Sequence, residues 1–410
     1  MTRIRPFKAV RPQPELASQV GSLPYDVLNS DEARANSEHS PYSFLHITKS
    51  EIDLPAGTDV HDPIVYQKAK ENLQSFLQNN ILLQEDKPAY YIYSLTMDSR
   101  EQTGIVAVSS LDDYENDIIK KHEFTRPEKE IDRINHIQIT EAQTGNVFLA
   151  YRNLAELDSL VQNWRNNHAP LYDFVAEDGV KHMVWVVDSY VEIEAITELF
   201  AKKIPNTYIA DGHHRAASAA KVRTALYTES KVEPAHFLTT LFPANQLHIM
   251  EYNRVVRDLN GLGSNDFLKE IAINFDVETS DFQVLPAEPH IFGMYLEKQW
   301  YSLKSKSTII NEDPIGILDV SILQNGLLDP ILGIQDPRTD KRIDFIGGIR
   351  GLDELERLVD SDKMKVAFSL YPVTIDQLFA IADSGNVMPP KSTWFEPKLR
   401  DGLLTHLINE

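Results

Sequence analysis

An apolar, β-prone run passes directly into a charged turn at Thr207-Tyr208-Ile209-Ala210-Asp211-Gly212-His213-His214-Arg215. The alanine-rich stretch 215–226 follows the turn and predicts a helix. On the N-terminal side, residues 183–187 predict a strand and residues 191–202 an amphipathic helix. Strand, helix, strand and helix at this spacing predict a parallel pair of strands with a right-handed crossover. The sequence therefore indicates an α/β fold around this turn.

The turn itself has the composition of an anion site. Where a strand leads into a helix, the first backbone N–H groups lack intrahelical partners and lie at the positive end of the helix dipole. Gly212 allows the backbone to approach a ligand closely, and Arg215 can direct a two-pronged donor at phosphate or carboxylate oxygens. His213 and His214 add two donors, and Asp211 can cap the helix or hold a metal or a ribose hydroxyl. The alternative is an ordinary capped helix with surface histidines, which this composition disfavours.

Other chemistry has weaker support in the sequence. A metal site built on His213 and His214 alone is disfavoured, because adjacent side chains diverge and no His-Glu-x-x-His spacing surrounds them. No Gly-x-Ser-x-Gly motif supports serine hydrolysis. Gly347-Gly348 follows a predicted strand but lacks the dinucleotide-binding glycine pattern.

Three parts with different patterns are predicted along the chain. Residues 1–87 form a loop-rich N-terminal α/β segment with one clear helix, for which Asp62 is the expected N-cap. Residues 88–260 form the core, and residues 261–410 a C-terminal α/β domain that begins where the pattern breaks. Besides those around the turn, the predicted elements are a helix at 63–77, strands at 90–95, 104–108, 146–151 and 238–242, helices at 267–273, 352–359 and 375–383, and strands at 291–295, 342–345 and 366–370.

Composition excludes several classes of function. The chain of 410 residues has no cysteine, so disulfides, thiolate nucleophiles and iron–sulfur clusters are excluded. Its net charge of −21 disfavours general nucleic-acid binding, because a phosphate backbone is repelled. It has no apolar run long enough to cross a bilayer and no signal-peptide pattern, so we expect a cytoplasmic protein without a membrane partner.

A second candidate element lies at Lys121-His122-Glu123-Phe124-Thr125, followed by Asp132-Arg133. A carboxylate beside a histidine is a plausible general base if it is held near a substrate hydroxyl. The dense charge of residues 111–133 is, however, also typical of a solvated helix or loop, and composition by itself favours that interpretation.

Two further segments are ambiguous from their residues alone. Lys391, Ser392 and Thr393 lie on an irregular stretch and could hold a phosphate or a carboxylate, although the glycines of a P-loop are missing. A C-terminal segment that packs through its apolar residues is an equal alternative. The turn Leu23-Pro24-Tyr25-Asp26-Val27 is usually structural, and Asp26 gains interest only if it meets the other elements in space.

In combination, these segments resemble the bacterial domain-of-unknown-function 1015 family. The resemblance covers nearly the whole chain, and its centre is similar to the ParB/sulfiredoxin-like fold, here with N- and C-terminal α/β extensions. It rests on four segments: Pro24-Tyr25-Asp26-Val27; Lys121-His122-Glu123-x-Thr125 with Asp132-Arg133; Asp211-Gly212-His213-His214-Arg215; and Met388-Pro389-Pro390-Lys391-Ser392-Thr393.

Within that fold the functional relatives that resemble this chain are the free-serine kinases, whose phosphate-binding turn also contains an Asp-Gly-x-His-Arg pattern. The resemblance implies a phosphotransferase with an alcohol acceptor, which moves phosphate from ATP or ADP to L-serine with Mg²⁺ as cofactor. It implies nucleotide and phosphate contacts for the turn 211–215, with His213 also catalytic and Asp211 as a possible contact to the metal. Glu123 would be the catalytic base.

Substrate contacts from Asp26, Arg133, Lys391, Ser392 and Thr393 are a more open expectation. The sequence leaves the phosphoryl donor, the acceptor and the oligomeric state undetermined. Two other functions stay open: a nucleotide-binding or nucleotide-hydrolysing switch without a metabolite acceptor, and a phosphodiesterase that uses His213 and His214. Sulfiredoxin chemistry is excluded by the absence of cysteine.

Overall fold

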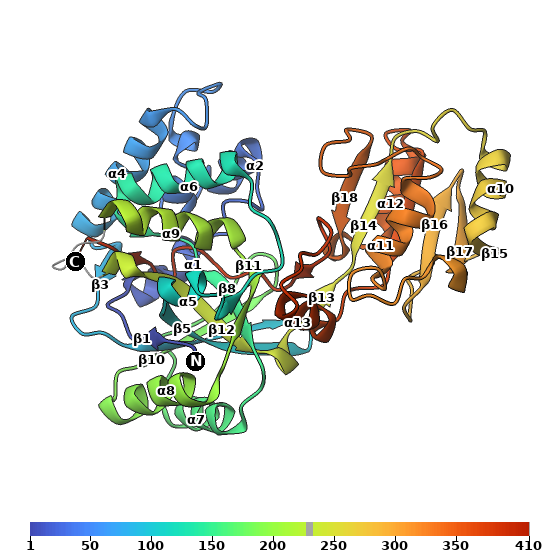
Figure 1. Ribbon diagram of the computed structural model, residues 1–410. Coiled ribbons are helices and arrows are strands. Elements are labelled where there is room, and N and C mark those ends of the chain that lie inside the picture. The colour runs from blue at the N-terminus through green and yellow to red at the C-terminus, as the bar shows by residue number, and fades with distance from the viewer. Residues whose placement is uncertain (227–232, 410) are drawn as a thin grey trace. The chain divides into compact units, whose positions relative to one another are not determined.

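The computed structural model describes residues 1–226 and 233–409 (Figure 1). They form two compact units. The first comprises residues 1–247 together with 397–410, and the second comprises residues 248–396. The C-terminal segment therefore belongs to the same unit as the turn at 211–215, although the second unit intervenes in sequence.

A nine-stranded mixed sheet is the centre of the first unit. Its order is β6 (Ile119–Lys120), β11 (Thr207–Asp211), β8 (Val147–Tyr151), β12 (His236–Pro243), β5 (Arg100–Ser110), β4 (Tyr90–Met97), β10 (Lys181–Val187) and β9 (Tyr172–Val175), with β1 (Ile4–Arg5) paired to β5. The pairs β11–β6 and β12–β8 are parallel, and all others are antiparallel. The predicted hairpin is confirmed as β4 and β5.

The predicted pairing of the strands on either side of the crossover helix is wrong. β10 pairs with β4 and β9, both antiparallel, whereas β11 pairs with β6 and β8. Helix α8 (Tyr190–Lys203) therefore carries the chain across the intervening strands before β11 begins. The apolar pattern of a strand specifies its buried faces but not its hydrogen-bonding partner, which is why spacing alone did not give the order.

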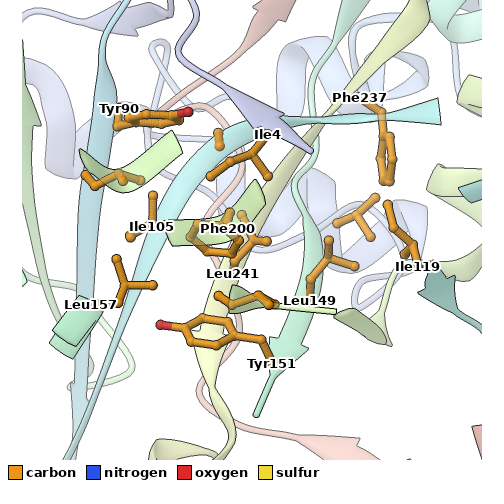
Figure 2. Close-up of a cluster of buried hydrophobic side chains, with 14 of the residues drawn as sticks. Ile4, Tyr90, Ile105, Ile119, Leu149, Tyr151, Leu157, Phe200, Phe237 and Leu241 are labelled. Atoms are coloured by element: carbon orange, nitrogen blue, oxygen red, sulfur yellow. The ribbon is translucent and has the colours of Figure 1, made fainter. Parts of the chain in front are cut away.

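Helices cover the sheet in two groups (Figure 1). α6 (Pro127–Thr140) packs against both α9 (His213–Leu226) and α4 (Pro63–Gln78). α4 begins as predicted, with Asp62 Oδ1 accepting a hydrogen bond from the Ile64 N–H at 3.0 Å. α7 (Ala155–Asn167) and α8 form the other group, and Leu157 and Phe200 from these helices enter the core beside the sheet residues Leu149, Tyr151 and Leu241 (Figure 2).

Short elements complete the first unit. The loop-rich start contains α1 (Ala17–Val20), α2 (Ser30–Ser37) and α3 (Leu45–Thr48), α5 (Leu111–Glu115) follows β5, and β2 (Val10–Pro12) pairs with β3 (Leu82–Gln84). The C-terminal segment returns as β21 (His406–Leu407), which pairs with β7 (Ala142–Gln143). Two bridges, Val10 with Thr405 and Ser22 with Asp401, join this segment to the N-terminal loops.

The second unit contains a six-stranded antiparallel sheet. Its order is β15 (Phe275–Ser280), β17 (Gln299–Ser305), β16 (Ile291–Leu296), β19 (Val366–Leu370), β14 (Tyr252–Val256) and β18 (Ile343–Gly347). Its helices are α10 (Ser264–Asn274), α11 (Asp319–Leu323), α12 (Gly351–Asp360) and α13 (Ile375–Asp383), and β13 (Ile249–Met250) pairs with β20 (Trp394–Phe395). The mixed α/β class is as predicted. In the part of the chain that is described, no helix has the length and apolar character that a membrane span requires.

Candidate functional site

Gly212 sets the geometry of the turn between β11 and α9. Its φ of +97° lies in the region that glycine adopts without strain. A Cβ at this position would lie 3.1 Å from Arg215 Nε and 3.4 Å from Val147 Cα. The turn therefore needs a glycine for two reasons: the backbone conformation, and the arginine side chain that folds back across it.

Arg215 is buried at the start of α9, with 8% of its surface exposed. Its Nη1 donates to the Asn146 carbonyl, and its Nη2 lies 3.3 Å from Asp211 Oδ2 and 3.9 Å from Asp26 Oδ2. Burial opposes its charge, but the nearby carboxylates outweigh that effect and raise the pKa of Arg215. The structure thus brings Asp26, Asp211 and Arg215 together, so the turn that carries Asp26 lies at the candidate site.

Asp211 is held between two cations. Besides Arg215, Lys398 Nζ lies 3.5 Å from Asp211 Oδ2. Burial tends to raise the pKa of Asp211, but Lys398 and Arg215 lower it well below its usual range. Asp211 is therefore ionised at neutral pH and fixes both cations beside the first turn of α9.

His213 lies inside the site next to Glu123. Its Nε2 accepts from the backbone N–H of His122 at 3.5 Å, and its Nδ1 lies 3.8 Å from Glu123 Oε2. Burial and the neighbouring His122 ring, 4.5 Å away between centroids, lower the pKa of His213 well below 6.5. The imidazole is thus neutral. Because Nε2 is the acceptor, the proton is on Nδ1 and faces the carboxylate.

His214 points to a different partner. Its Nε2 accepts from the Arg126 backbone N–H at 3.0 Å, so this histidine anchors the loop that leads into α6. Burial lowers its pKa as well. The two adjacent histidines therefore diverge, as expected for neighbouring residues, and each one holds the backbone of the segment that carries Glu123.

The segment 121–133 is not the uniformly solvated helix that its composition favours. Glu123 is half-exposed on a loop, whereas Glu130, Asp132 and Arg133 on α6 are buried. Glu130 accepts from Thr125 and pairs with Lys221 on α9. These contacts join α6 to α9 and hold the loop beside the turn.

A pocket opens beside Arg215. The empty space of this pocket, which includes open solvent, is about 410 Å³. The guanidinium of Arg133 lies 3.9 Å from the centre of the Tyr25 ring, and its Nε donates to Asp132 at 2.8 Å. The residues that line the pocket include Tyr25, Arg133, His136, Gly145 and Arg215. Two anchored cations and apolar walls suit a small anionic ligand.

Three residues of the site were missed by sequence reasoning. Lys398 and Asp401 arrive on the C-terminal segment, and Gly145 lies in the loop before β8. Asp401 is buried, with 1% of its surface exposed, and its backbone exchanges hydrogen bonds with that of Ser22. No local pattern distinguishes these residues, because their roles come from contacts with residues that are distant in sequence.

Lys391, Ser392 and Thr393 lie in the second unit, where their segment is tied to β14. The Ser392 hydroxyl donates to the Pro389 carbonyl at 2.6 Å, and Lys391 Nζ lies 5.4 Å from the centre of the Tyr252 ring. Buried Arg254 donates to the Lys391 carbonyl at 3.0 Å. These contacts give the segment a structural role within its own unit, and a substrate contact for Lys391, Ser392 or Thr393 stays a prediction.

The described residues do not form a ready-made metal site. Across residues 1–226 and 233–409, no group of three or more metal-ligating side chains is assembled. Asp211 is the carboxylate of the turn and is engaged by Lys398 and Arg215. A cation that arrives on a nucleotide needs only one or two protein carboxylates, so the residues present are compatible with metal bound through phosphate.

Comparisons with solved structures give distant likenesses. A free serine kinase in complex with AMP aligns with 73% of this chain and 92% of its own, at 12% identity and a TM-score of 0.36. SbnI from Staphylococcus aureus, with a C-terminal truncation, aligns with 72% of this chain and 85% of its own, at 11% identity and a TM-score of 0.39. A conserved hypothetical protein from Pyrococcus furiosus aligns at 13% identity with a TM-score of 0.36, over 74% of this chain and 95% of its own.

The search of curated proteins gives no match. A family model described as a protein of unknown function, DUF1015, matches residues 4–321. That range contains Asp26, Glu123, Arg133 and the turn at 211–215, and it ends before Lys398 and Asp401. The chain therefore belongs to the DUF1015 family.

Proposed function

We propose that this protein is a small-molecule kinase that transfers a phosphoryl group from ATP or ADP to the hydroxyl of free L-serine. The observation that carries the proposal is the placement of Glu123 3.8 Å from His213 Nδ1, at a helix start that also holds Arg215. Phosphoryl transfer needs a base or orienting group for the hydroxyl, and donors for the charge on the phosphate. The loop that carries Glu123 offers the first, and Arg215 at the start of α9 offers the second.

Arg215 and the first N–H groups of α9 would bind the transferred phosphoryl group. The arginine remains charged at any physiological pH because Asp211, Asp26 and Asp401 surround it. It is also fixed before the ligand arrives, through its bond to the Asn146 carbonyl. Such prior fixing reduces the reorganisation that the reaction requires.

Glu123 would accept the hydroxyl proton as the serine oxygen attacks the terminal phosphorus. One O–P bond forms, and the bond from that phosphorus to the bridging oxygen breaks. The leaving nucleotide is ADP from ATP or AMP from ADP, and the product is O-phospho-L-serine. Neutral His213 would orient Glu123 with its Nδ1–H, which leaves the carboxylate ionised and able to take the proton.

Mg²⁺ bound to the nucleotide would supply charge neutralisation on the phosphate oxygens. Asp211 is the residue of the turn that could contact it, and Lys398 would then remain beside the phosphates. We also infer that the first unit has the ParB/sulfiredoxin-like fold. This inference is supported by the parallel β6–β11 pair, which delivers the turn to the start of α9.

The proposal is tested by whether nucleotide consumption depends on the acceptor. The purified full chain with Mg²⁺ and either ATP or ADP should consume nucleotide only when L-serine is added. Arg215→Ala should weaken nucleotide binding by roughly tenfold or more, the scale of a lost charge-assisted contact. Nucleotide hydrolysis at the same rate without any acceptor would instead support a nucleotide-driven switch.

A further inference from the structure

The carboxylates around Arg215 differ in how they are neutralised. Asp211 forms ion pairs with Lys398 and Arg215, and Asp132 forms one with Arg133. Asp26 lies 3.9 Å from Arg215 Nη2 and is half-exposed to water. Asp401 alone of this group is fully buried and has no ion pair within 4 Å among the described residues.

One oxygen of Asp401 has no partner. Oδ2 is buried and accepts no hydrogen bond from any residue in 1–226 or 233–409. Burial raises the pKa of this carboxyl to about 7, with Asp26 adding to the effect and Arg215, Arg133 and the Tyr25 backbone opposing it. A buried acceptor left without a hydrogen bond destabilises the folded protein, and a charged one more so. The free lone pairs of Oδ2 are therefore available to a hydrogen-bond donor from a ligand.

Gly145 lines the pocket and also lies close to the Asp401 carboxylate. A Cβ on Gly145 would lie 3.2 Å from Asp401 Oδ1 and 3.3 Å from Arg215 Cδ. Gly145 and Arg215 both line the pocket, and Arg215 Nε is a second buried polar atom without a hydrogen-bond partner in the described chain. Asp401 and Arg215, each with one unpartnered buried polar atom, therefore both lie close to Gly145.

We propose that Asp401 binds the protonated amine of the acceptor, so that the acceptor class is a hydroxyl compound with a free ammonium group. This inference rests on the proposed kinase function. An ammonium group supplies the N–H donor that Oδ2 lacks, and its positive charge neutralises the carboxylate. A directly bound metal ion is a poorer match, because no third ligand accompanies Asp26 and Asp401 in the described residues.

The proposal gives the C-terminal segment a function. The segment 397–408 follows the second unit and places Lys398 beside Asp211 and Asp401 beside Gly145. Its position is fixed by the Ser22 bridge and by Arg400, which pairs with Asp178. The segment thus contributes the amine-binding carboxylate of the proposed acceptor site.

The first arm of the test needs no variant. Phosphorylation of L-serine is compared with that of 3-hydroxypropionate and glycerate, which carry the same hydroxymethyl and carboxylate groups without the amine. We expect kcat/KM for both analogues to be about 10- to 100-fold lower than for serine, the scale of one charge-assisted contact. Equal phosphorylation of serine and the analogues would overturn the amine site and leave the kinase function intact.

The second arm uses Asp401→Asn, with Asp178→Asn as the matched control. Asp178→Asn loosens the same segment without altering the Asp401 carboxylate. Asp401→Asn should raise the KM for serine about 10- to 100-fold, leave the KM for 3-hydroxypropionate and the nucleotide Kd unchanged, and so abolish the preference for the amine. An equal loss for both acceptors would mean a structural role and would overturn the proposal.

If no acceptor is phosphorylated, the proposed function is wrong, and binding alone decides the amine site. Calorimetric titration of the wild-type protein with serine and with 3-hydroxypropionate then gives the comparison. Binding of serine only, lost in Asp401→Asn, would support an amine site. Equal binding of the two, or no binding of either, would overturn it.

Discussion

Lys398 Nζ lies 3.5 Å from Asp211 Oδ2, although 187 positions separate the two residues in sequence. The lysine is mostly buried and comes from the segment that returns to the first unit after residue 396. Its charge faces the carboxylate nearest in sequence to the proposed phosphate site. We therefore expect Lys398 to offset the repulsion between Asp211 and an incoming phosphate.

Replacement of Lys398 by methionine tests that role. Lys398→Met should weaken ATP and ADP binding about 5- to 30-fold, because Asp211 then presents a less compensated negative charge. Calorimetry of nucleotide binding is the measurement. Lys203→Met, which removes an exposed lysine paired with Glu156, is the control and should bind nucleotide normally. An unchanged Kd in Lys398→Met would remove the lysine from the site.

Gly212 and Gly179 form a matched pair of glycines. Both have positive φ, +97° and +80°, but only at Gly212 would a Cβ approach Arg215; at Gly179 nothing lies within 4 Å. Both alanine variants should lose about 1–2 kcal/mol of stability from backbone strain. Only Gly212→Ala should also lose nucleotide binding, since it displaces the guanidinium. Equal nucleotide affinity in the two variants would contradict the proposed contact.

A control on the same segment distinguishes the role of Glu123 from a general effect of removing one negative charge. Glu123→Gln should lower turnover by roughly 10²–10⁴, the usual contribution of a general base, and leave the nucleotide Kd unchanged. Glu128, which is exposed at the start of α6, serves as the control, and Glu128→Gln should retain full activity. A parallel fall in binding and turnover for Glu123→Gln would assign it a structural role.

A buried histidine predicts a dependence of stability on pH. His182 is fully buried, with its Nδ1 2.8 Å from the Tyr93 hydroxyl and its Nε2 3.4 Å from Arg400 Nε, and burial together with Arg400 lowers its pKa to about 3. Because the folded-state pKa lies below the unfolded value, the unfolded chain takes up the proton first. Stability is therefore complete above about pH 6.5 and declines as the pH falls toward 3.

Thermal unfolding between pH 7.5 and pH 4.5 measures this effect. His182→Gln should lower Tm at pH 7.5 and reduce the further decrease of Tm on acidification. His122 and His136, whose pKa values burial lowers to about 4, should keep part of the acid sensitivity. The exposed His39 provides the control, since His39→Gln should follow the wild-type curve. Identical slopes for wild type and His182→Gln would contradict the assignment.

Sequence reasoning succeeded where the signal is local. The turn 211–215, its glycine and the helix after it are specified by neighbouring residues, as are the cap at Asp62 and the hairpin of β4 and β5. The position of Glu123 beside His213 needed the family pattern, because charge density alone suggested a solvated segment.

The remainder depends on contacts that no local pattern encodes. The neighbours of β10 and β11 in the sheet are chosen by tertiary packing, and their apolar residues do not distinguish one partner from another. Lys398 and Asp401 reach the site only because the chain returns from the second unit. The segment of Lys391 is held by Arg254 within its own unit, and a substrate contact from Lys391 stays a prediction.

Phosphorus NMR of the reaction mixture detects phosphoryl transfer to a free amino acid without any coupled enzyme. The full chain is incubated with Mg²⁺, L-serine and either ATP or ADP, with Glu123→Gln as the control of low turnover. We predict a phosphomonoester resonance that coincides with added O-phospho-L-serine and appears with one of the two donors. Inorganic phosphate without any O-phospho-L-serine, or no new resonance despite bound nucleotide, would contradict the proposed kinase function.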